Sequence, residues 1–268
     1  MDGEHLPGGS GGVWRVRGED GAIRVHRPTG PWTPAVHALL AHLEAAGLGG
    51  IPHVEGIDAE GREVLSYLPG RTPDPSRETV DDEALATAAA WLRSFHTAVA
   101  DFDPGPVEWR QGVFALGPGE VICHNDTGLY NWVVDERGSF VGMIDWDRAG
   151  PGRPLDDLAF LCWSGVPLMR EIPTPRAAGR LRVAADAYGD VSPEALLDAV
   201  DARMRLTAER WRVGIERGDP GTLAIQAAGI PERHAAQLRG FESRIAGIRH
   251  GLREAGAPTS DGASTSTR

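Results

Sequence analysis

Two short apolar segments in the middle of the chain each end in polar side chains. The first, residues 121–123, is followed by His124, Asn125 and Asp126, with Asn131 five residues further on, and the second ends at Asp145. Mg²⁺ prefers oxygen ligands and keeps several waters, so one carboxylate and one amide oxygen from the protein can suffice. We therefore interpret Asn131 and Asp145 as a candidate metal-binding pair.

A second carboxylate is needed to face the nucleophile rather than the metal. Asp126 lies in the loop that follows the first apolar segment, where it could orient and deprotonate a substrate hydroxyl. Phosphoryl transfer demands mainly positioning and charge neutralisation, so few protein groups are required. The pattern therefore predicts metal-assisted phosphoryl transfer.

This stretch resembles the catalytic core of the aminoglycoside phosphotransferase and choline kinase family, which are relatives of protein kinases. The motif reads His124-Asn125-Asp126, four further residues, Asn131, and then Ile144-Asp145-Trp146-Asp147, and it continues with Gly150-Pro151 and Asp157-Leu158-Ala159. The combination is specific, although its strong motifs span only residues 121–163. The resemblance implies that Asp126 is the catalytic base, that Asn131 and Asp145 bind the metal, and that His124 shapes the catalytic loop. It implies help with metal or substrate for Asp147, for which a loop-capping carboxylate is the alternative, and Mg²⁺ with ATP or GTP as donor.

Family members usually place a lysine on the third strand to bind phosphate, whereas this chain has no lysine and 27 arginines. Arg27 is the first choice for a substitute, since an arginine stays charged and can bind phosphate through two donors. Arg24 and His26 are the rivals, because the strand register is uncertain. The helix expected over residues 34–46 offers His37 and Glu44 as partners, neither of them certain.

Two further segments could contact the nucleotide. The run Gly8-Gly9-Ser10-Gly11-Gly12 could cover phosphates with the backbone N–H groups of Gly11 and Gly12, and a flexible linker is the alternative. Residues 64–70 resemble an inter-lobe hinge, whose backbone from Ser66 to Leu68 would bind the purine.

The order of elements predicts an α+β, protein-kinase-like fold with two lobes. A small β-rich lobe that binds nucleotide is expected over residues 1–70, with hairpins at 13–28 and 53–70 and a helix that has Thr33 as N-cap. A larger, mainly helical lobe with catalytic and acceptor-binding roles is expected over 71–256. The small polar residues of 257–268 are typical of a disordered tail.

The composition limits the partners and the location. A net charge of −11 disfavours nucleic-acid binding, which needs a basic surface. We expect no signal peptide, because no positively charged start is followed by an apolar run. We expect no membrane span, because no apolar run of about 18 residues exists. Cys123 and Cys162 each lie in an apolar run and are interpreted as buried free thiols. These features are typical of a cytoplasmic protein.

The function predicted is a small-molecule kinase that phosphorylates a hydroxyl of an antibiotic or a metabolite. An acidic pocket would suit a cationic aminoglycoside, but a nucleoside or another hydroxylated acceptor is equally compatible. Two alternatives stay open at this point. One is a nucleotide-binding pseudokinase, suggested by the missing lysine, and the other is a metal-dependent phosphoesterase, although two-metal hydrolases usually need more ligands.

Overall fold

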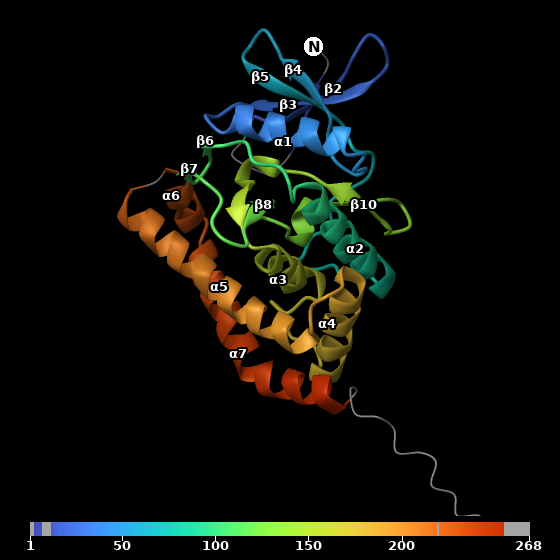
Figure 1. Ribbon diagram of the computed structural model, residues 1–268, viewed down its shortest axis with the longest axis vertical. Helices are drawn as coiled ribbons and strands as arrows, with labels where there is room; N and C mark the ends of the chain where they lie inside the picture. The colour runs from blue at the N-terminus through green and yellow to red at the C-terminus, as the bar shows by residue number, and fades with distance from the viewer. Residues whose placement is uncertain (1–2, 7–11, 219, 255–268) are drawn as a thin grey trace, which may run out of the picture.

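The computed structural model describes residues 3–6, 12–218 and 220–254. A five-stranded antiparallel sheet forms one end of the molecule, with strand order β1-β2-β3-β5-β4 (Figure 1). The strands are β1 (Gly3–His5), β2 (Trp14–Arg17), β3 (Ile23–Pro28), β4 (Val54–Ile57) and β5 (Arg62–Ser66). Because β5 inserts between β3 and β4, residues near position 63 lie directly beside residues near position 27.

Helix α1 (Thr33–Ala45) accompanies this sheet and follows β3. Its stripe of Leu39, Leu40 and Leu43 is at most 1% exposed, as the helical spacing of these residues predicts. The expected N-cap is wrong by one residue. Trp32 is the N-cap, and the hydroxyl of Thr33 instead accepts a hydrogen bond from the N–H of Gly30 at 2.9 Å.

Short strands and turns form the centre of the molecule, between the sheet and the helices (Figure 1). Strand β8 pairs with β11, β9 with β10, and β6 with β7, all antiparallel. The elements are β6 (Val107–Trp109), β7 (Gly112–Phe114), β8 (Val121–Cys123), the 3-10 turn η1 (Leu129–Asn131), β9 (Trp132–Val134), β10 (Phe140–Met143), the 3-10 turn η2 (Trp146–Arg148) and β11 (Gly150–Gly152).

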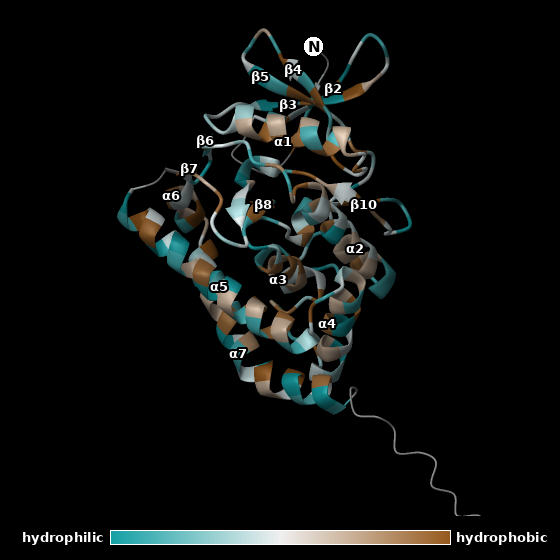
Figure 2. Ribbon diagram, in the orientation of Figure 1, coloured by the Kyte–Doolittle hydropathy of each residue, from teal (hydrophilic) through white to brown (hydrophobic). Residues whose placement is uncertain are grey.

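Helices make up the rest of the described chain. They are α2 (Asp82–Ala98), α3 (Pro154–Gly165), α4 (Thr174–Tyr188), α5 (Pro193–Glu216), α6 (Pro220–Ala227) and α7 (Ile230–Glu254). Helix α2 packs on α4, α3 on α5, and α4 on α7. Apolar and polar residues alternate around α5 and α7 (Figure 2), which is typical of helices with one face in the core.

The loop after α1 joins the sheet end to the helical end through a close glycine contact. The N–H of Met143 on β10 donates to the carbonyl of Gly50 at 2.9 Å, and the indole of Trp91 on α2 donates to the carbonyl of Gly49 at 2.7 Å. A Cβ at Gly142 would lie 2.1 Å from that Gly50 oxygen. Only a residue without a side chain allows this approach. The seam between the lobes, by which we mean the contact of Gly49 and Gly50 with β10 and α2, therefore depends on glycine at position 142.

The predicted architecture is confirmed: a small β-rich part precedes a larger helical part. The division at residue 70 stays a prediction, and the expected tail, residues 257–268, lies outside the described residues. Strand β1, the β6–β7 hairpin, β11 and α6 were not expected from the sequence. Both cysteines are buried and free, as predicted. Among the described helices, none combines the length and the apolar character that crossing a membrane requires.

Candidate active site

The loop that follows β8 is held in place by one buried carboxylate. Asp157 on α3 is 1% exposed and accepts the backbone N–H groups of His124 and Asn125, both at 2.7 Å. His96 on α2 lies 3.3 Å from the same carboxylate. Burial alone would raise the pKa of Asp157, but the hydrogen bond and charge of His96 and the backbone N–H groups outweigh it and lower the pKa. Asp157 is therefore a charged brace for the loop.

His124 links this loop to the second motif segment. Its side chain is fully buried, its Nδ1 accepts from the N–H of Asp126 at 3.3 Å, and its Nε2 lies 3.1 Å from the carbonyl of Ile144. With Nδ1 as acceptor, Nε2 carries the proton and donates to that carbonyl. This geometry supports the role of shaping the catalytic loop, because the ring has no exposed surface with which to touch an acceptor.

Asp126 presents its carboxylate at the surface of the loop, with 14% of the side chain exposed. One oxygen accepts the hydroxyl of Tyr130, and the other accepts the amide of Asn131 at 3.2 Å. The guanidinium of Arg148 lies 3.7 Å from this second oxygen. The carboxylate is thus oriented on both sides, and an acceptor hydroxyl would compete with Tyr130 for the first oxygen.

The segments that carry Asn131 and Asp145 are joined by a backbone hydrogen bond. The N–H of Ile144 donates to the carbonyl of Asn131 at 2.9 Å, which brings the two motif segments together. The amide nitrogen of Asn131 is used by Asp126, while its amide oxygen accepts no hydrogen bond from any described residue. Asp145 adopts φ 63°, and its side chain is 41% exposed. One free amide oxygen and one accessible carboxylate form a donor set that suits Mg²⁺.

Asp147 is arranged differently. One of its oxygens contacts Arg27, and the other contacts Arg110 at 2.8 Å. Burial raises the pKa of Asp147 and neighbouring Asp145 adds to the rise, while the charges of Arg27 and Arg110 oppose it. Both oxygens contact arginines, which favours a structural role, the kind of role that the loop-capping alternative assumed, over the predicted help with metal or substrate.

Arg27 on β3 reaches from the sheet to the motif. It lies 3.0 Å from Glu63 on β5 and 3.3 Å from Asp145, in addition to its contact with Asp147. The Arg27 Nε forms an ion pair with Glu63, but the angles of this contact do not satisfy those of a hydrogen bond. Burial would lower the pKa of Arg27, but the three carboxylates outweigh it and raise the pKa.

The two rivals of Arg27 lie on the other face of β3. Arg24 pairs with Asp20 at 2.7 Å and with Glu55, while His26 pairs with Asp58 at 2.7 Å. Neither contacts the motif residues, because strand side chains alternate between the two faces. The register of the sheet therefore favours Arg27.

Of the two partners expected on helix α1, His37 reaches the ion pair of Arg27 and Glu44 does not. His37 donates to Glu63 at 2.8 Å, and Glu63, only 3% exposed, pairs with Arg27. Glu44 instead pairs with His53 at 3.1 Å, away from Arg27. The sequence reasoning missed Glu63, since a strand residue becomes a neighbour of Arg27 only once β5 is known to pair with β3.

Arg110 was also missed. It lies in the turn between β6 and β7, pairs with Asp147, and stacks over the ring of Trp32 at 4.5 Å from the centroid. This contact ties the segment before α1 to the motif. No spacing rule connects Arg110 with Asp147, so this ion pair could not be predicted from the sequence.

The expected nucleotide contacts are described only in part. Gly11 lies outside the described residues, and Gly12, at φ 79°, closes the β1–β2 connection. The N–H of Ser66 donates to the carbonyl of His53 at 2.9 Å, so it is not free for a base. The N–H of Leu68 makes no hydrogen bond to any described residue, so Leu68 keeps the donor that the prediction requires.

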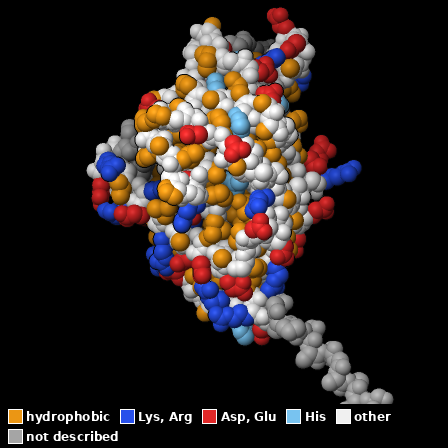
Figure 3. Space-filling view, viewed as in Figure 1, with side chains coloured by type: hydrophobic (Ala, Val, Ile, Leu, Met, Phe, Trp, Pro, Cys, Tyr) orange, Lys and Arg blue, Asp and Glu red, His pale blue; other side chains and the backbone are white. Residues whose placement is uncertain are grey.

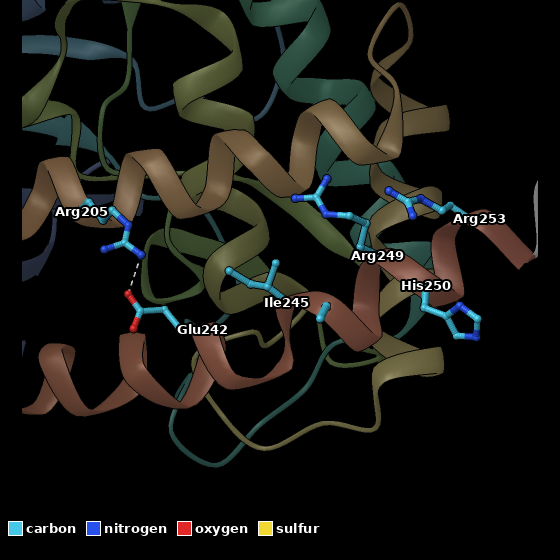
Figure 4. Close-up of a pocket in the computed structure, with 7 residues that line it drawn as sticks. Arg205, Glu242, Ile245, Arg249, His250 and Arg253 are labelled. Carbon is cyan, nitrogen blue, oxygen red and sulfur yellow. Dashed lines mark hydrogen bonds and ion pairs between the residues drawn. The ribbon is translucent and has the colours of Figure 1, made fainter.

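A shallow depression of about 780 Å³ lies elsewhere, between α5 and α7 (Figure 4). Arg205 and Glu242 form an ion pair across it at 2.6 Å, and its other lining residues include Arg249 and Arg253. None of its residues belongs to the motif. Charged side chains of both signs gather at this helical end of the molecule (Figure 3), and we assign no part of the reaction to it.

Three solved structures resemble the chain in fold. The amicoumacin kinase in complex with AMP-PNP and Ca²⁺ has a TM-score of 0.61 at 14% identity, covering 91% of this chain and 87% of its own. The microcompartment-associated aminopropanol kinase has a TM-score of 0.60 at 16% identity, covering 94% of both chains. The GDP complex of aminoglycoside 2'-phosphotransferase-IIIa has a TM-score of 0.55 at 13% identity, covering 92% and 93%. These likenesses show a protein-kinase-like fold.

The sequence comparisons identify the family. The model of the phosphotransferase enzyme family, APH, matches residues 107–199, a span that contains Asp126, Asn131 and Asp145. The trifolitoxin immunity protein of Rhizobium leguminosarum bv. trifolii is 37% identical over 178 residues, which cover 62% of this chain and 67% of that protein. The predicted resemblance is thus confirmed, and the chain belongs to the APH phosphotransferase enzyme family.

Proposed function

We propose that the chain is a small-molecule kinase that transfers the γ-phosphate of ATP or GTP to a hydroxyl of an antibiotic or a metabolite. One observation carries this proposal. Arg27 contacts Asp145, the backbone beside Asp145 pairs with Asn131, and Asn131 holds Asp126. A phosphate-binding cation, a pair of metal ligands and a base therefore follow one another along a single line of contacts.

Each group on this line has a role that its contacts support. Arg27 would bind the phosphates of the nucleotide, exchanging Asp145 or Asp147 for phosphate oxygens. Asn131 and Asp145 would hold Mg²⁺, which, when bound, neutralises charge on the phosphates. Asp126 would accept the proton of the acceptor hydroxyl, and His124 and Asp157 keep its loop in place. The backbone N–H of Leu68 would contact the purine, with the carbonyl of Ser66 beside it.

The named relatives support an antibiotic as one class of acceptor. The trifolitoxin immunity protein is named for immunity, and the amicoumacin kinase is named for the compound amicoumacin. If the acceptor is an antibiotic, phosphorylation would give resistance. The reaction would take place in the cytoplasm, where ATP, GTP and Mg²⁺ are available.

The test follows ADP and GDP formation by purified protein with Mg²⁺, across aminoglycosides, nucleosides, peptide antibiotics and common hydroxylated metabolites. Asp126→Asn should reduce acceptor-dependent turnover by about 10²- to 10⁴-fold, the usual contribution of a general base. Nucleotide affinity should stay near that of the wild type, because Asp126 faces the acceptor. Glu136→Gln, an exposed residue of the nearby β9–β10 turn, is the matched control.

Three outcomes would contradict the proposal or its assignment of the base. Nucleotide binding without turnover on any acceptor would favour a pseudokinase. Release of phosphate from phosphoesters without a nucleotide would favour a phosphoesterase. Undiminished turnover in Asp126→Asn would show that the base has been assigned wrongly.

A further inference from the structure

The hydroxyl of Tyr130 already lies against the carboxylate that we propose as the catalytic base. Tyr130 belongs to the 3-10 turn η1, and its hydroxyl donates a hydrogen bond to one oxygen of Asp126. A general base must lie within hydrogen-bond reach of the proton that it removes. The phenol of Tyr130 meets this condition within the chain itself, before any acceptor has bound.

A glycine in the same loop makes room for this contact. A Cβ at Gly128 would lie 2.5 Å from one ring carbon of Tyr130 and 3.1 Å from its hydroxyl oxygen. The backbone of Gly128 is extended, with φ −64° and ψ 154°, which any residue can adopt. The missing side chain of Gly128, rather than an unusual conformation, therefore allows the ring to fold back onto Asp126.

Tyr130 is also open to solvent, unlike its two neighbours in η1. It is 43% exposed, whereas Leu129 is fully buried and Asn131 is 4% exposed. The amide oxygen of Asn131 is half of the proposed Mg²⁺ site, and in phosphoryl transfer the metal bridges the β- and γ-phosphates. One three-residue turn thus carries an accessible hydroxyl, held by the base, next to a residue that would help to hold the phosphates.

We propose that Tyr130 is a site of self-phosphorylation, which takes the γ-phosphate of ATP or GTP when no acceptor is bound. This inference rests on the proposed kinase function. The Tyr130 oxygen would form a bond to the γ-phosphorus, and the bond from that phosphorus to the β–γ bridging oxygen would break. Asp126 would take the phenolic proton, and ADP or GDP would leave. Because the hydroxyl contacts Asp126 of its own chain, the transfer would be intramolecular.

The modification would block the site in which it forms. A phosphotyrosine carries a charge of about −1.5 to −2 at neutral pH, and this charge would lie beside the carboxylate of Asp126. It would also fill the place that the acceptor hydroxyl needs. An acceptor that displaces Tyr130 from Asp126 would prevent the modification, so bound acceptor should protect the protein from it.

The test measures transfer of labelled phosphate to the protein. Purified protein is first treated with a phosphatase, which is then removed, and is incubated with Mg²⁺ and γ-labelled ATP or GTP without an acceptor. Peptide mass spectrometry separates Tyr130 from the other two tyrosines, Tyr67 and Tyr188. We expect one phosphate at Tyr130, at a rate per molecule that does not change on dilution. Tyr130→Phe should take up none, and Asp126→Asn should slow the labelling by about 10²-fold or more.

Gly128→Ala tests the geometry while keeping both the hydroxyl and the base. Its Cβ would occupy the space of the Tyr130 ring and should slow labelling by about 10- to 100-fold, the usual effect of a misplaced reacting group. Gly179→Ala is the matched control, because Gly179 is an exposed residue of helix α4 with open space around its Cβ position. It should be labelled at the wild-type rate, and circular dichroism would show that both variants are folded.

Several results would overturn the inference: no label at Tyr130, undiminished labelling of Asp126→Asn, equal labelling of the two alanine variants, or a rate per molecule that rises with protein concentration. A parallel screen of acceptors separates this inference from the kinase proposal. Acceptor turnover without label at Tyr130 would reject the self-phosphorylation alone. The absence of both label and acceptor turnover would reject the kinase proposal as well.

Discussion

Replacing Asp157 by alanine should destabilise the whole molecule, although the residue touches no substrate. Its carboxylate is buried and accepts two backbone N–H groups at 2.7 Å and one from His96 at 3.3 Å. Hydrogen bonds to a charged group contribute about 1.5–3 kcal/mol each, and each buried N–H left unpaired costs about 1–3 kcal/mol. The hydrogen-bond energies and the costs of unpaired N–H groups count the same contacts, so they do not add. We therefore expect the free energy of unfolding to fall by about 3–5 kcal/mol, the range for removing one partner of a buried ion pair.

Urea denaturation of the wild type and the variant, followed by circular dichroism, would measure this loss. A chain of this size loses about 2–4 °C of Tm per kcal/mol, so thermal unfolding should shift by roughly 10 °C. The pKa of Asp157 is lower in the folded state than in the unfolded chain. Its contribution is therefore complete above the unfolded pKa of about 3.9 and is lost as the pH falls through the folded pKa. The difference between wild type and variant should be constant from about pH 5 upward and shrink in more acidic solution.

Asp156→Ala is the matched control for this experiment. Asp156 is the preceding residue, is only partly buried, and contacts Arg153 at 3.4 Å near the surface. Surface ion pairs contribute about 0–1 kcal/mol, so the control should remain close to the wild type. A loss below about 1 kcal/mol for Asp157→Ala, or an equal loss in the control, would refute the view that this carboxylate braces the catalytic loop.

Two further predictions concern the catalytic carboxylate and the seam between the lobes. Tyr130→Phe should lower the acceptor KM by about 3- to 10-fold with kcat nearly unchanged. The reason is that the acceptor no longer competes with the Tyr130–Asp126 hydrogen bond, worth about 1 kcal/mol. A raised KM would instead show that the Tyr130 hydroxyl helps to bind the acceptor. Gly142→Ala should lower stability by at least about 2 kcal/mol, since its Cβ would meet the Gly50 carbonyl at 2.1 Å. Gly240→Ala, at an open helical position, should be neutral or stabilising in the same denaturation assay. Equal effects of the two alanines would contradict the close contact.

The parts of the site that lie close together in the sequence could be predicted. The spacing from Asp126 to Asn131 spans a single loop, and Asp145 lies two residues after β10, the strand that pairs with the one after Asn131. Local spacing and one hairpin are enough to bring these three residues together. The α1 stripe and the hairpins were predictable for the same reason, because they depend on periodicity within one segment.

The charge pairs around the site could not be predicted, because they join segments far apart in the chain. Arg27 meets Glu63 through the insertion of β5 beside β3, and Arg110 meets Asp147 from a turn without periodicity. Arg203 looks like an ordinary exposed residue of a long helix until its contact with the catalytic loop is known. Strands β1 (Gly-Glu-His) and β11 (Gly-Pro-Gly) contain no apolar run, so they leave no strand pattern in the sequence.

The carboxylates around Arg27 determine how strongly its contribution to nucleotide affinity should depend on ionic strength. In the structure described, Glu63, Asp145 and Asp147 already surround the guanidinium. A phosphate that arrives there replaces one anion by another, so the net number of ion pairs hardly changes. Added salt would then weaken the starting and the final arrangement alike, and the contribution of Arg27 to nucleotide affinity would be less sensitive to ionic strength than that of an unpaired cation.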